Sequence, residues 1–250
     1  MKNNRLSWIL PLIARKYPVP GEGPEISSVS LIVASVRGRS AGRITELIEK
    51  ERRFYDIVEI RDDLINGPGG TVSTIMKKLQ AEEIPFIFTH RDNNADRAKL
   101  SYLEATGFDP VALDLDVSLA GIRKDLKDQD VIFSYHGERR SPSEVMEEIR
   151  KMGSPLGKMA VPYRNRISFL EDLSEVADYK RRTGYPIAFM PMQEGFMGDR
   201  LLSAFYVSDL LYASLGKQTA RGQPTVREAA ALRKLASEYG KHGYQSLNDE

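Results

Sequence analysis

The chain contains no cysteine, a single tryptophan and only three histidines among its 250 residues. The lack of cysteine excludes disulfides, thiolate metal sites and a cysteine nucleophile, and it is compatible with a reducing compartment such as the cytoplasm. Basic and acidic residues nearly cancel, at 36 against 35, so no general attraction to nucleic acid or to a membrane surface is expected. No stretch reaches the roughly 18 apolar residues of a membrane span. We therefore expect a cytoplasmic globular protein that binds neither nucleic acid nor membrane.

The first 28 residues are predicted to form an N-terminal extension and linker, followed by one domain over 29–250. An apolar run over 7–14 has the composition of a signal peptide, but Pro11 interrupts it and two basic residues follow it at once. Because a cleavage site is expected where those basic residues stand, we do not expect secretion. Prolines and glycines within 18–24 indicate a linker.

From residue 30 onward, apolar β-branched runs alternate with amphipathic stretches. In one of these stretches, 41–52, Ile44, Leu47 and Ile48 share a face, as in a helix that packs on a core. The last run, 210–215, is the weakest strand candidate; the alternative is the end of a helix, with the strand beginning nearer Ala213. The predicted strands are 30–35, 56–60, 85–89, 111–115, 131–134, 158–161, 186–190 and 210–215. The predicted helices are 41–52, 72–83, 96–106, 143–152, 167–183 and 199–208.

Eight strand candidates at intervals of roughly 20–30 residues, each expected to be followed by a helix, are typical of an α/β fold of the (β/α)8 TIM barrel type, in a single domain with an N-terminal extension. The alternative is an open doubly wound sheet, which usually carries a glycine-rich phosphate loop after its first strand. The segment 38–42 stands at that place but lacks the glycine spacing of such a loop. The barrel is therefore the favoured prediction.

Active sites of barrels gather at the carboxyl ends of the strands, and polar residues follow several of the predicted strands. His136 directly follows one apolar run, and Lys158 enters the next. An imidazole and an amine on neighbouring strands are a plausible acid/base and nucleophile pair, although each alone also reads as an ordinary strand-end residue. No two histidines have metal-ligand spacing, so no metal is expected. The nearby arginines favour an anionic substrate, because a guanidinium matches a carboxylate.

Six short motifs together resemble the type I 3-dehydroquinate dehydratases, in the order found in that family. The similarity runs from about residue 31 to 235. It implies a barrel, usually dimeric, that converts 3-dehydroquinate to 3-dehydroshikimate in the shikimate pathway through a Schiff base, without metal or cofactor. The motifs are Glu59-Ile60-Arg61, Phe88-Thr89-His90-Arg91, Asp114-Leu115-Asp116, Ser134-Tyr135-His136, Gly157-Lys158-Met159-Ala160-Val161 and Gly222-Gln223.

The resemblance implies that Lys158 is the nucleophile and His136 the general acid/base. A lysine that condenses with a ketone gives an iminium ion, which acts as an electron sink for proton loss beside it. We expect apolar neighbours such as Met159 and Val161, together with arginine charges, to disfavour the lysine cation. His136 can accept and donate a proton near neutral pH. His90 also ends a strand and competes for that role.

The resemblance also implies a set of substrate-binding side chains. Arg200 matches the residue that grips the substrate carboxylate, assisted by Thr219 and Gln223. Ser35, Glu59, Arg61 and Arg91 match the groups that hold the hydroxyls and position the ring. An alternative interpretation makes Glu59 and Arg61 a structural ion pair at a strand end.

One departure from the family affects the acid/base residue. Family members usually carry a glutamate that partners the catalytic histidine, four residues after the match to Arg91; here that position is Ala95. Asp92 or Asp96 is a candidate substitute, although an aspartate is shorter. Two other functions therefore stay open: a Schiff-base aldolase or lyase acting on another keto acid, and a non-catalytic relative that only binds.

Overall fold

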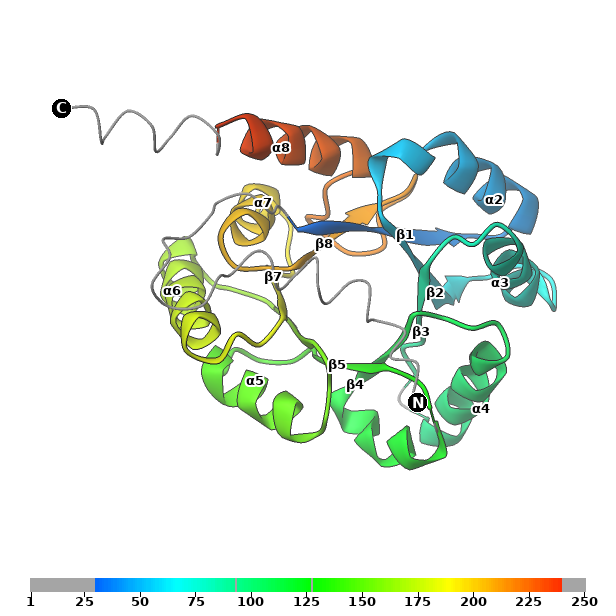
Figure 1. Cartoon of the computed structure of the whole chain (residues 1–250), viewed down its shortest axis with the longest axis horizontal. Helices are drawn as coiled ribbons and strands as arrows, with labels where there is room; N and C mark the ends of the chain where they lie inside the picture. The colour runs from blue at the N-terminus through cyan, green and yellow to red at the C-terminus, as the bar shows by residue number, and fades with distance from the viewer. Residues whose placement is uncertain (1–29, 93, 127, 240–250) are drawn as a thin grey trace.

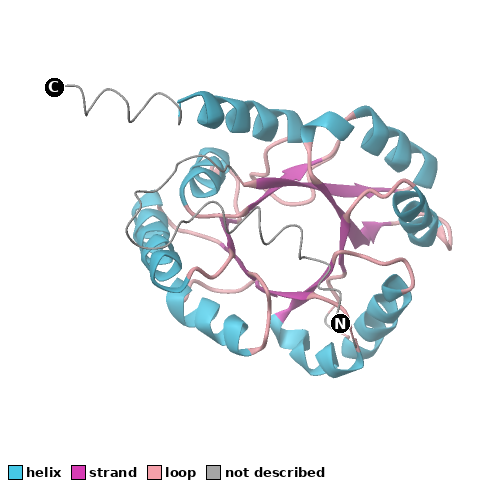
Figure 2. Cartoon of the chain, in the orientation of Figure 1, coloured by secondary structure: helices cyan, strands magenta, loops and turns pink. Residues whose placement is uncertain are grey.

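Eight parallel strands form the inner wall of a barrel, and helices cover its outside (Figure 1). In Figure 2 the strands make a ring at the centre of the view, enclosed by helices on nearly all sides. The computed structural model describes residues 30–92, 94–126 and 128–239. The predicted extension over 1–28 lies outside the described residues. So does His242, the last of the three histidines in the sequence.

The elements follow one another in the alternating order that the sequence predicts. The strands are β1 (Leu31–Gly38), β2 (Ile57–Ile65), β3 (Phe86–Thr89), β4 (Ala112–Asp116), β5 (Val131–Tyr135), β6 (Gly157–Val161), β7 (Ile187–Pro191) and β8 (Leu210–Ser214). The α-helices are α2 (Ala41–Lys50), α3 (Thr71–Ala81), α4 (Ala95–Thr106), α5 (Pro142–Lys151), α6 (Arg166–Thr183), α7 (Met197–Tyr206) and α8 (Val226–Tyr239). Two 3-10 segments, η1 (Arg52–Phe54) and η2 (Val117–Asp125), complete the order.

The barrel prediction is confirmed, and so is each of the eight strands, including the eighth. Two connections differ from the helices expected from the sequence. The link from β4 to β5 is the 3-10 segment η2, and β8 is followed by α8, which the sequence analysis did not identify. The strands β1 and β2 also continue past their predicted ends, and Gly38 pairs with Ile65 beyond a bulge.

The strand order is β7-β6-β5-β4-β3-β2-β1-β8, so the barrel closes between β7 and β8. Side chains just before β8 close this seam. The carboxylate of Asp209 accepts from the backbone N–H of Ile187 at 2.8 Å and from Lys180 Nζ at 2.5 Å. The hydroxyl of Ser208 accepts from the N–H of Phe189 at 3.1 Å. Buried backbone donors at the seam therefore keep partners where the regular ladder is interrupted.

Alternation along each strand separates two apolar clusters. Successive side chains of a strand point to opposite faces of the sheet. In β6, Met159 and Val161 belong to the cluster that packs against the helices, whereas Ala160 belongs to the cluster inside the barrel. Lys158, two residues before Ala160, shares its inward direction. On other strands, such as β2, the apolar inward residue Ile57 comes first and polar inward residues follow, so the barrel interior is mostly apolar toward the amino ends of the strands and polar toward their carboxyl ends.

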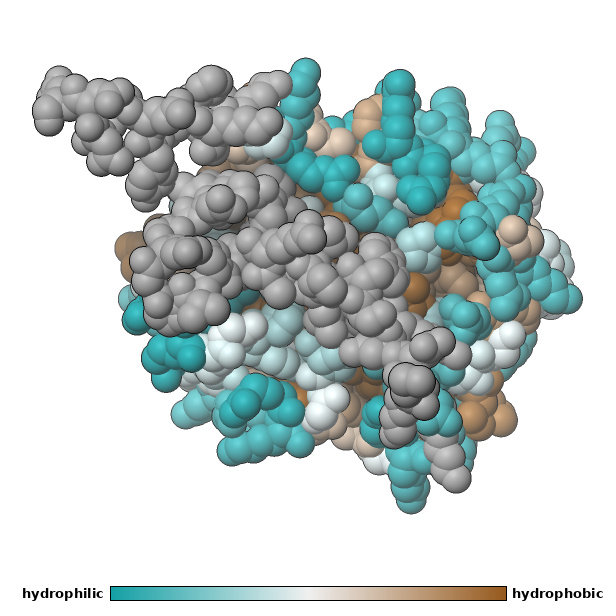
Figure 3. Space-filling model, viewed as in Figure 1, coloured by the Kyte–Doolittle hydropathy of each residue, from teal (hydrophilic) through white to brown (hydrophobic). Residues whose placement is uncertain are grey.

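The outer surface over several helices is hydrophilic. Figure 3 shows teal side chains gathered over α2 and α8 at the top of the view. Helix α2 turns Ile44 and Ile48 inward, and Leu47 packs at the edge of the core, as its sequence pattern predicts. None of the helices in the described ranges combines the length and the apolar composition needed to cross a bilayer.

Candidate active site

The nine side chains identified from the sequence line one pocket of about 300 Å3 at the carboxyl ends of the strands. Met190, Met192 and Tyr212 add apolar and aromatic walls. The structure therefore brings together residues that are as much as 188 positions apart in the chain. The nine are Ser35, Glu59, Arg61, Arg91, His136, Lys158, Arg200, Thr219 and Gln223.

Lys158 is buried inside the barrel and held by a carboxylate. Its Nζ donates to Asp114 Oδ2 at 2.6 Å and lies 3.7 Å from Glu59 Oε1. This environment differs from the apolar one expected from the sequence. Because β6 alternates, Met159 and Val161 face the helices and do not contribute to the pocket. The Lys158 amine is therefore surrounded by carboxylates as well as by apolar side chains.

Asp114 lies at the centre of this arrangement. Its Oδ1 accepts from Arg91 Nη2 at 2.9 Å and from Ser134 Oγ at 2.6 Å, while its Oδ2 accepts from Lys158. Burial alone would raise the pKa of the Asp114 carboxyl, but the cations of Arg91 and Lys158 outweigh it and lower the pKa well below its ordinary value. Asp114 is therefore a buried anion shared by two cations, a role that the sequence analysis did not assign.

Glu59 and Arg61 do not pair with each other, so the ion pair considered as an alternative is absent from this pocket. The carboxylate of Glu59 accepts from Thr89 Oγ1 at 3.0 Å and from the hydroxyl of Ser35. Arg61 instead makes a two-pronged contact with Asp63, at 2.9 and 2.7 Å. Glu59 is thus fixed beside Lys158, and Arg61 is anchored at the rim of the pocket.

His136 is oriented by a carboxylate from the neighbouring strand. Its Nδ1 lies 3.2 Å from Asp116 Oδ2, and Asp116 is itself fixed by the N–H and hydroxyl of Ser118, at 3.0 and 2.7 Å. Burial lowers the pKa of His136, the charges of Arg91 and Lys158 lower it further, and the hydrogen bond to Asp116 acts against them. The net result is a pKa below the ordinary histidine value, so the neutral ring is favoured near pH 7.

Neither aspartate proposed as the substitute partner reaches His136 in this structure. Asp92 accepts from the N–H of Asn94 and pairs with Arg97 at 3.0 Å, and Asp96 is exposed in the first turn of α4. The question left open by the sequence is answered by a third aspartate: Asp116, two residues after Asp114 on β4, lies on the strand next to His136. The repeated acid in Asp114-Leu115-Asp116 was the available signal, since side chains two apart share a face.

His90 is engaged elsewhere and does not line the pocket. Its Nδ1 lies 2.7 Å from Asp62 Oδ2, and its backbone carbonyl accepts from the Tyr102 hydroxyl at 2.9 Å. The geometry therefore favours His136 over His90 as the imidazole of this site.

Arg200 is buried in the pocket wall without an anionic partner. Within the described ranges, its guanidinium contacts only the carbonyl of Arg221 at 3.1 Å and Met190 Sδ at 4.0 Å, and its Nε has no acceptor. Burial lowers the pKa of Arg200 to about 10, which leaves the group charged near neutral pH. A buried cation with free donors is costly unless a ligand supplies the anion. Arg200 is therefore the strongest anion-binding group of the pocket.

The loop after β8 is closed by Gln223. Its Oε1 accepts from the N–H and hydroxyl of Thr219, at 3.1 and 2.8 Å, and its Nε2 donates to Ser35 Oγ at 3.2 Å. Gly222 has φ +67, and a Cβ there would collide with the carbonyl oxygen of Gln193. Glycine thus permits the close approach that brings Thr219 and Gln223 to the pocket.

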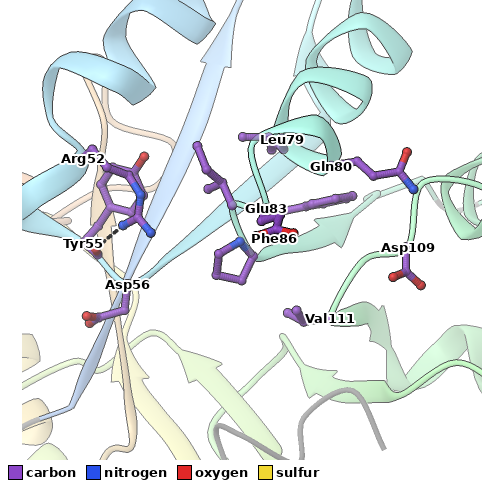
Figure 4. Close-up of a pocket in the computed structure, with 11 residues that line it drawn as sticks. Arg52, Tyr55, Asp56, Leu79, Gln80, Glu83, Phe86, Asp109 and Val111 are labelled. Carbon is purple, nitrogen blue, oxygen red and sulfur yellow. Dashed lines mark hydrogen bonds between the residues drawn. The ribbon is translucent and has the colours of Figure 1, made fainter. Parts of the chain in front are cut away.

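A larger cavity of about 680 Å3 lies at the opposite end of the barrel (Figure 4). Its lining comes from residues just before β2, β3 and β4, among them Asp56, Pro85 and Asp109. Its lining, among the described residues, contains no lysine or histidine, and Asp56 is already bound to Arg233 at 2.5 Å. In the described ranges, no three histidine, aspartate or glutamate side chains are grouped as a metal site. The amine, the imidazole and the guanidinium that the sequence identifies all lie in the smaller pocket.

Comparison with known proteins agrees with this geometry. A family model for type I 3-dehydroquinase matches residues 32–239. The chain is 32% identical over 201 residues to the 3-dehydroquinate dehydratase of Thermoplasma volcanium, a match that covers 79% of this chain and 85% of that protein. The chain belongs to the type I 3-dehydroquinase family. The resemblance identified from six short motifs is confirmed at the level of the family.

Other relatives support the same assignment. The 3-dehydroquinate dehydratase of Thermoplasma acidophilum is 30% identical over 198 residues, with 78% of this chain and 85% of that protein covered. The crystal structure of 3-dehydroquinate dehydratase from Geobacillus kaustophilus matches with a TM-score of 0.70 at 20% identity. That match covers 84% of this chain and 92% of the other, and at this identity it supports the fold alone.

The pairing of His136 with Asp116 makes a prediction for the titration of the ring. We expect His136 to titrate below about 6.5, the ordinary histidine value, when its ring signals are followed by NMR. In Asp116→Asn the pKa falls further, because a neutral amide no longer stabilises the protonated ring.

Asp92→Asn is the matched control, since Asp92 pairs with Arg97 and does not contact His136. It leaves the His136 pKa unchanged. An unchanged or raised pKa in Asp116→Asn, or equal shifts in both variants, contradicts the pairing.

Proposed function

We propose that this chain dehydrates 3-dehydroquinate to 3-dehydroshikimate through a Schiff base on Lys158, as a step of the shikimate pathway. The observation that carries the proposal is a single pocket lined by a buried amine, an imidazole and an unpaired guanidinium. Membership of the type I 3-dehydroquinase family supports the substrate and the reaction. No metal or cofactor is required, since an iminium ion supplies the electron sink.

Lys158 is the nucleophile. After losing a proton, its amine adds to the ketone carbon of the substrate, and loss of water gives a protonated imine. The positive nitrogen withdraws electrons from the adjacent carbon, so a proton there leaves far more readily than beside the ketone itself. Departure of the hydroxyl from the next carbon completes the elimination, and water then hydrolyses the imine to release product and amine.

His136 is the general acid/base. Its Nδ1 is occupied by Asp116, which leaves Nε2 for proton exchange with the substrate. The lowered pKa favours the neutral ring, the form that accepts the proton beside the iminium carbon. Once protonated, the same ring is able to donate to the departing hydroxyl. Asp116 takes the orienting part that a glutamate usually has in the family.

The binding residues divide by the part of the substrate that they contact. Arg200 holds the substrate carboxylate, because its donors lack an anion in the pocket, and Thr219 and Gln223 assist from the loop after β8. The remaining four residues contact the hydroxyls and hold the ring against the reacting groups. These four are Ser35, Glu59, Arg61 and Arg91.

Replacing the nucleophile separates turnover from binding. In Lys158→Ala we expect kcat to fall at least about 10⁴-fold, because no iminium forms, while binding of quinate is retained. Product formation is followed by absorbance and quinate binding by calorimetry. Lys151→Ala, at an exposed position on α5, is the matched control and keeps full activity. Turnover in Lys158→Ala comparable to that of the unmodified chain rules out the Schiff base.

Replacing Arg200 tests the class of substrate. In Arg200→Met we expect KM for 3-dehydroquinate to rise about 10- to 100-fold, with a smaller change in kcat, because a charge-assisted contact to the carboxylate is lost. Steady-state kinetics give both constants. Arg221→Met is the control, since that side chain is exposed and only its backbone carbonyl contacts Arg200. An unchanged KM in Arg200→Met places the carboxylate elsewhere.

We extend the proposal to a homodimer in the cytoplasm. Apolar side chains are exposed on the adjacent helices α6 and α7, including Ile167 at 71% and Tyr206 at 60%. Their burial against a second copy would lower the free energy. The absence of cysteine is compatible with the reducing cytoplasm. Light scattering is expected to give twice the 28.2 kDa of one chain, and the mass of a single chain contradicts the dimer.

A further inference from the structure

Tyr212 lines the pocket but has no role in the reaction proposed above. It is the third residue of β8, only 4% exposed, and it lines the pocket together with Lys158. Its hydroxyl is buried and has no hydrogen-bond partner within the described ranges. Buried polar groups without partners are rare and call for a physical explanation.

The ring of Tyr212 faces the nucleophile directly. Lys158 Nζ lies 3.7 Å from the ring centroid. A cation within about 6 Å of an aromatic centroid is attracted by the negative face of the ring, and the attraction is strongest where water is excluded. Both side chains are about 95% buried, so this contact is made in a nearly dry interior.

The carboxylates near the Lys158 nitrogen also accept hydrogen bonds from other side chains. Asp114 is shared with Arg91 and Ser134, and Glu59 accepts from Thr89 and from Ser35. Tyr212 adds an uncharged aromatic face to the carboxylates around the Lys158 nitrogen.

Tyr212 also stays uncharged. Burial raises the pKa of its hydroxyl well above the ordinary value, and the negative charges of Asp114 and Glu59 raise it further. A phenolate beside Lys158 would be a base able to remove a proton from the nitrogen. A neutral ring stabilises positive charge on that nitrogen but accepts no proton from it.

We propose that Tyr212 is a positioning residue for the Schiff base, whose ring face holds the Lys158 nitrogen and favours the protonated imine over the neutral one. This inference rests on the proposed function. Only the protonated imine is an effective electron sink. The ring attracts the Lys158 ammonium before condensation, and by the same attraction it favours the protonated imine once the imine has formed.

The test compares variants that separate the ring from the hydroxyl. Tyr212→Leu and Tyr212→Met remove the aromatic face and keep apolar volume, whereas Tyr212→Phe removes only the hydroxyl. The imine formed with saturating 3-dehydroquinate is trapped with borohydride, and the trapping rate is read by intact mass. Affinity for quinate, which has a hydroxyl in place of the ketone and forms no imine, is measured in parallel.

We expect imine trapping to slow about tenfold in Tyr212→Leu and in Tyr212→Met, with quinate affinity changed less than about threefold. Tyr212→Phe recovers most of the trapping rate because the ring remains. Since quinate requires an intact pocket, a retained affinity excludes misfolding as the cause.

Three results overturn the inference. They are trapping unchanged in both aliphatic variants, equal loss in Tyr212→Phe, and parallel loss of imine and quinate binding in both aliphatic variants. The second result would mean that the hydroxyl, and not the ring, is responsible for the effect. The third would mean that Tyr212 only packs against its neighbours. If the unmodified chain forms no adduct, the proposed function fails and this inference fails with it. An adduct on the unmodified chain together with any of the three results overturns the inference alone.

Discussion

The carboxylate of Asp114 holds two cations, the buried Lys158 at 2.6 Å and the partly buried Arg91 at 2.9 Å, at the carboxyl end of the barrel. Charges in such a place are costly to desolvate, and they persist because each is paired and hydrogen-bonded. The rest of the pocket is arranged around this anion. Glu59 lies on the other side of the Lys158 nitrogen, and the two cations lower the pKa of His136 beyond the effect of burial. Removing the shared anion would leave Arg91 without the carboxylate it now contacts and Lys158 with Glu59 alone, at 3.7 Å.

The barrel wall explains how the charged cluster is kept dry. Inward residues near the amino ends of the strands, such as Val33, Ile57 and Ile132, form an apolar cluster beneath the pocket. The polar residues lie nearer the carboxyl ends, where the connecting loops supply further groups. Arg200, in contrast, is a buried cation for which the described residues supply no anion. The Lys158 amine thus has carboxylate partners from the protein itself. Arg200 keeps donors that remain available for a substrate carboxylate.

Much of this could be predicted from the sequence, because spacing and alternation are local properties. The eight strands followed from apolar periodicity, and the nine pocket residues followed from the family resemblance, with six of them inside the quoted motifs. The pairings could not be predicted, since they depend on which strands are neighbours and on their register. Asp116 partners His136 because β4 and β5 pair with Asp116 opposite Ser134. The same alternation shows that Met159 faces away from the amine, and it was available from the sequence.

The proposed reaction depends most on a covalent bond between Lys158 and the substrate. Borohydride reduction in the presence of 3-dehydroquinate, followed by peptide mapping, tests that bond directly. We predict one stable adduct located on the peptide that contains Lys158, and none when quinate replaces the ketone. A folded protein that binds quinate but gives no adduct, or an adduct on another lysine, contradicts the account.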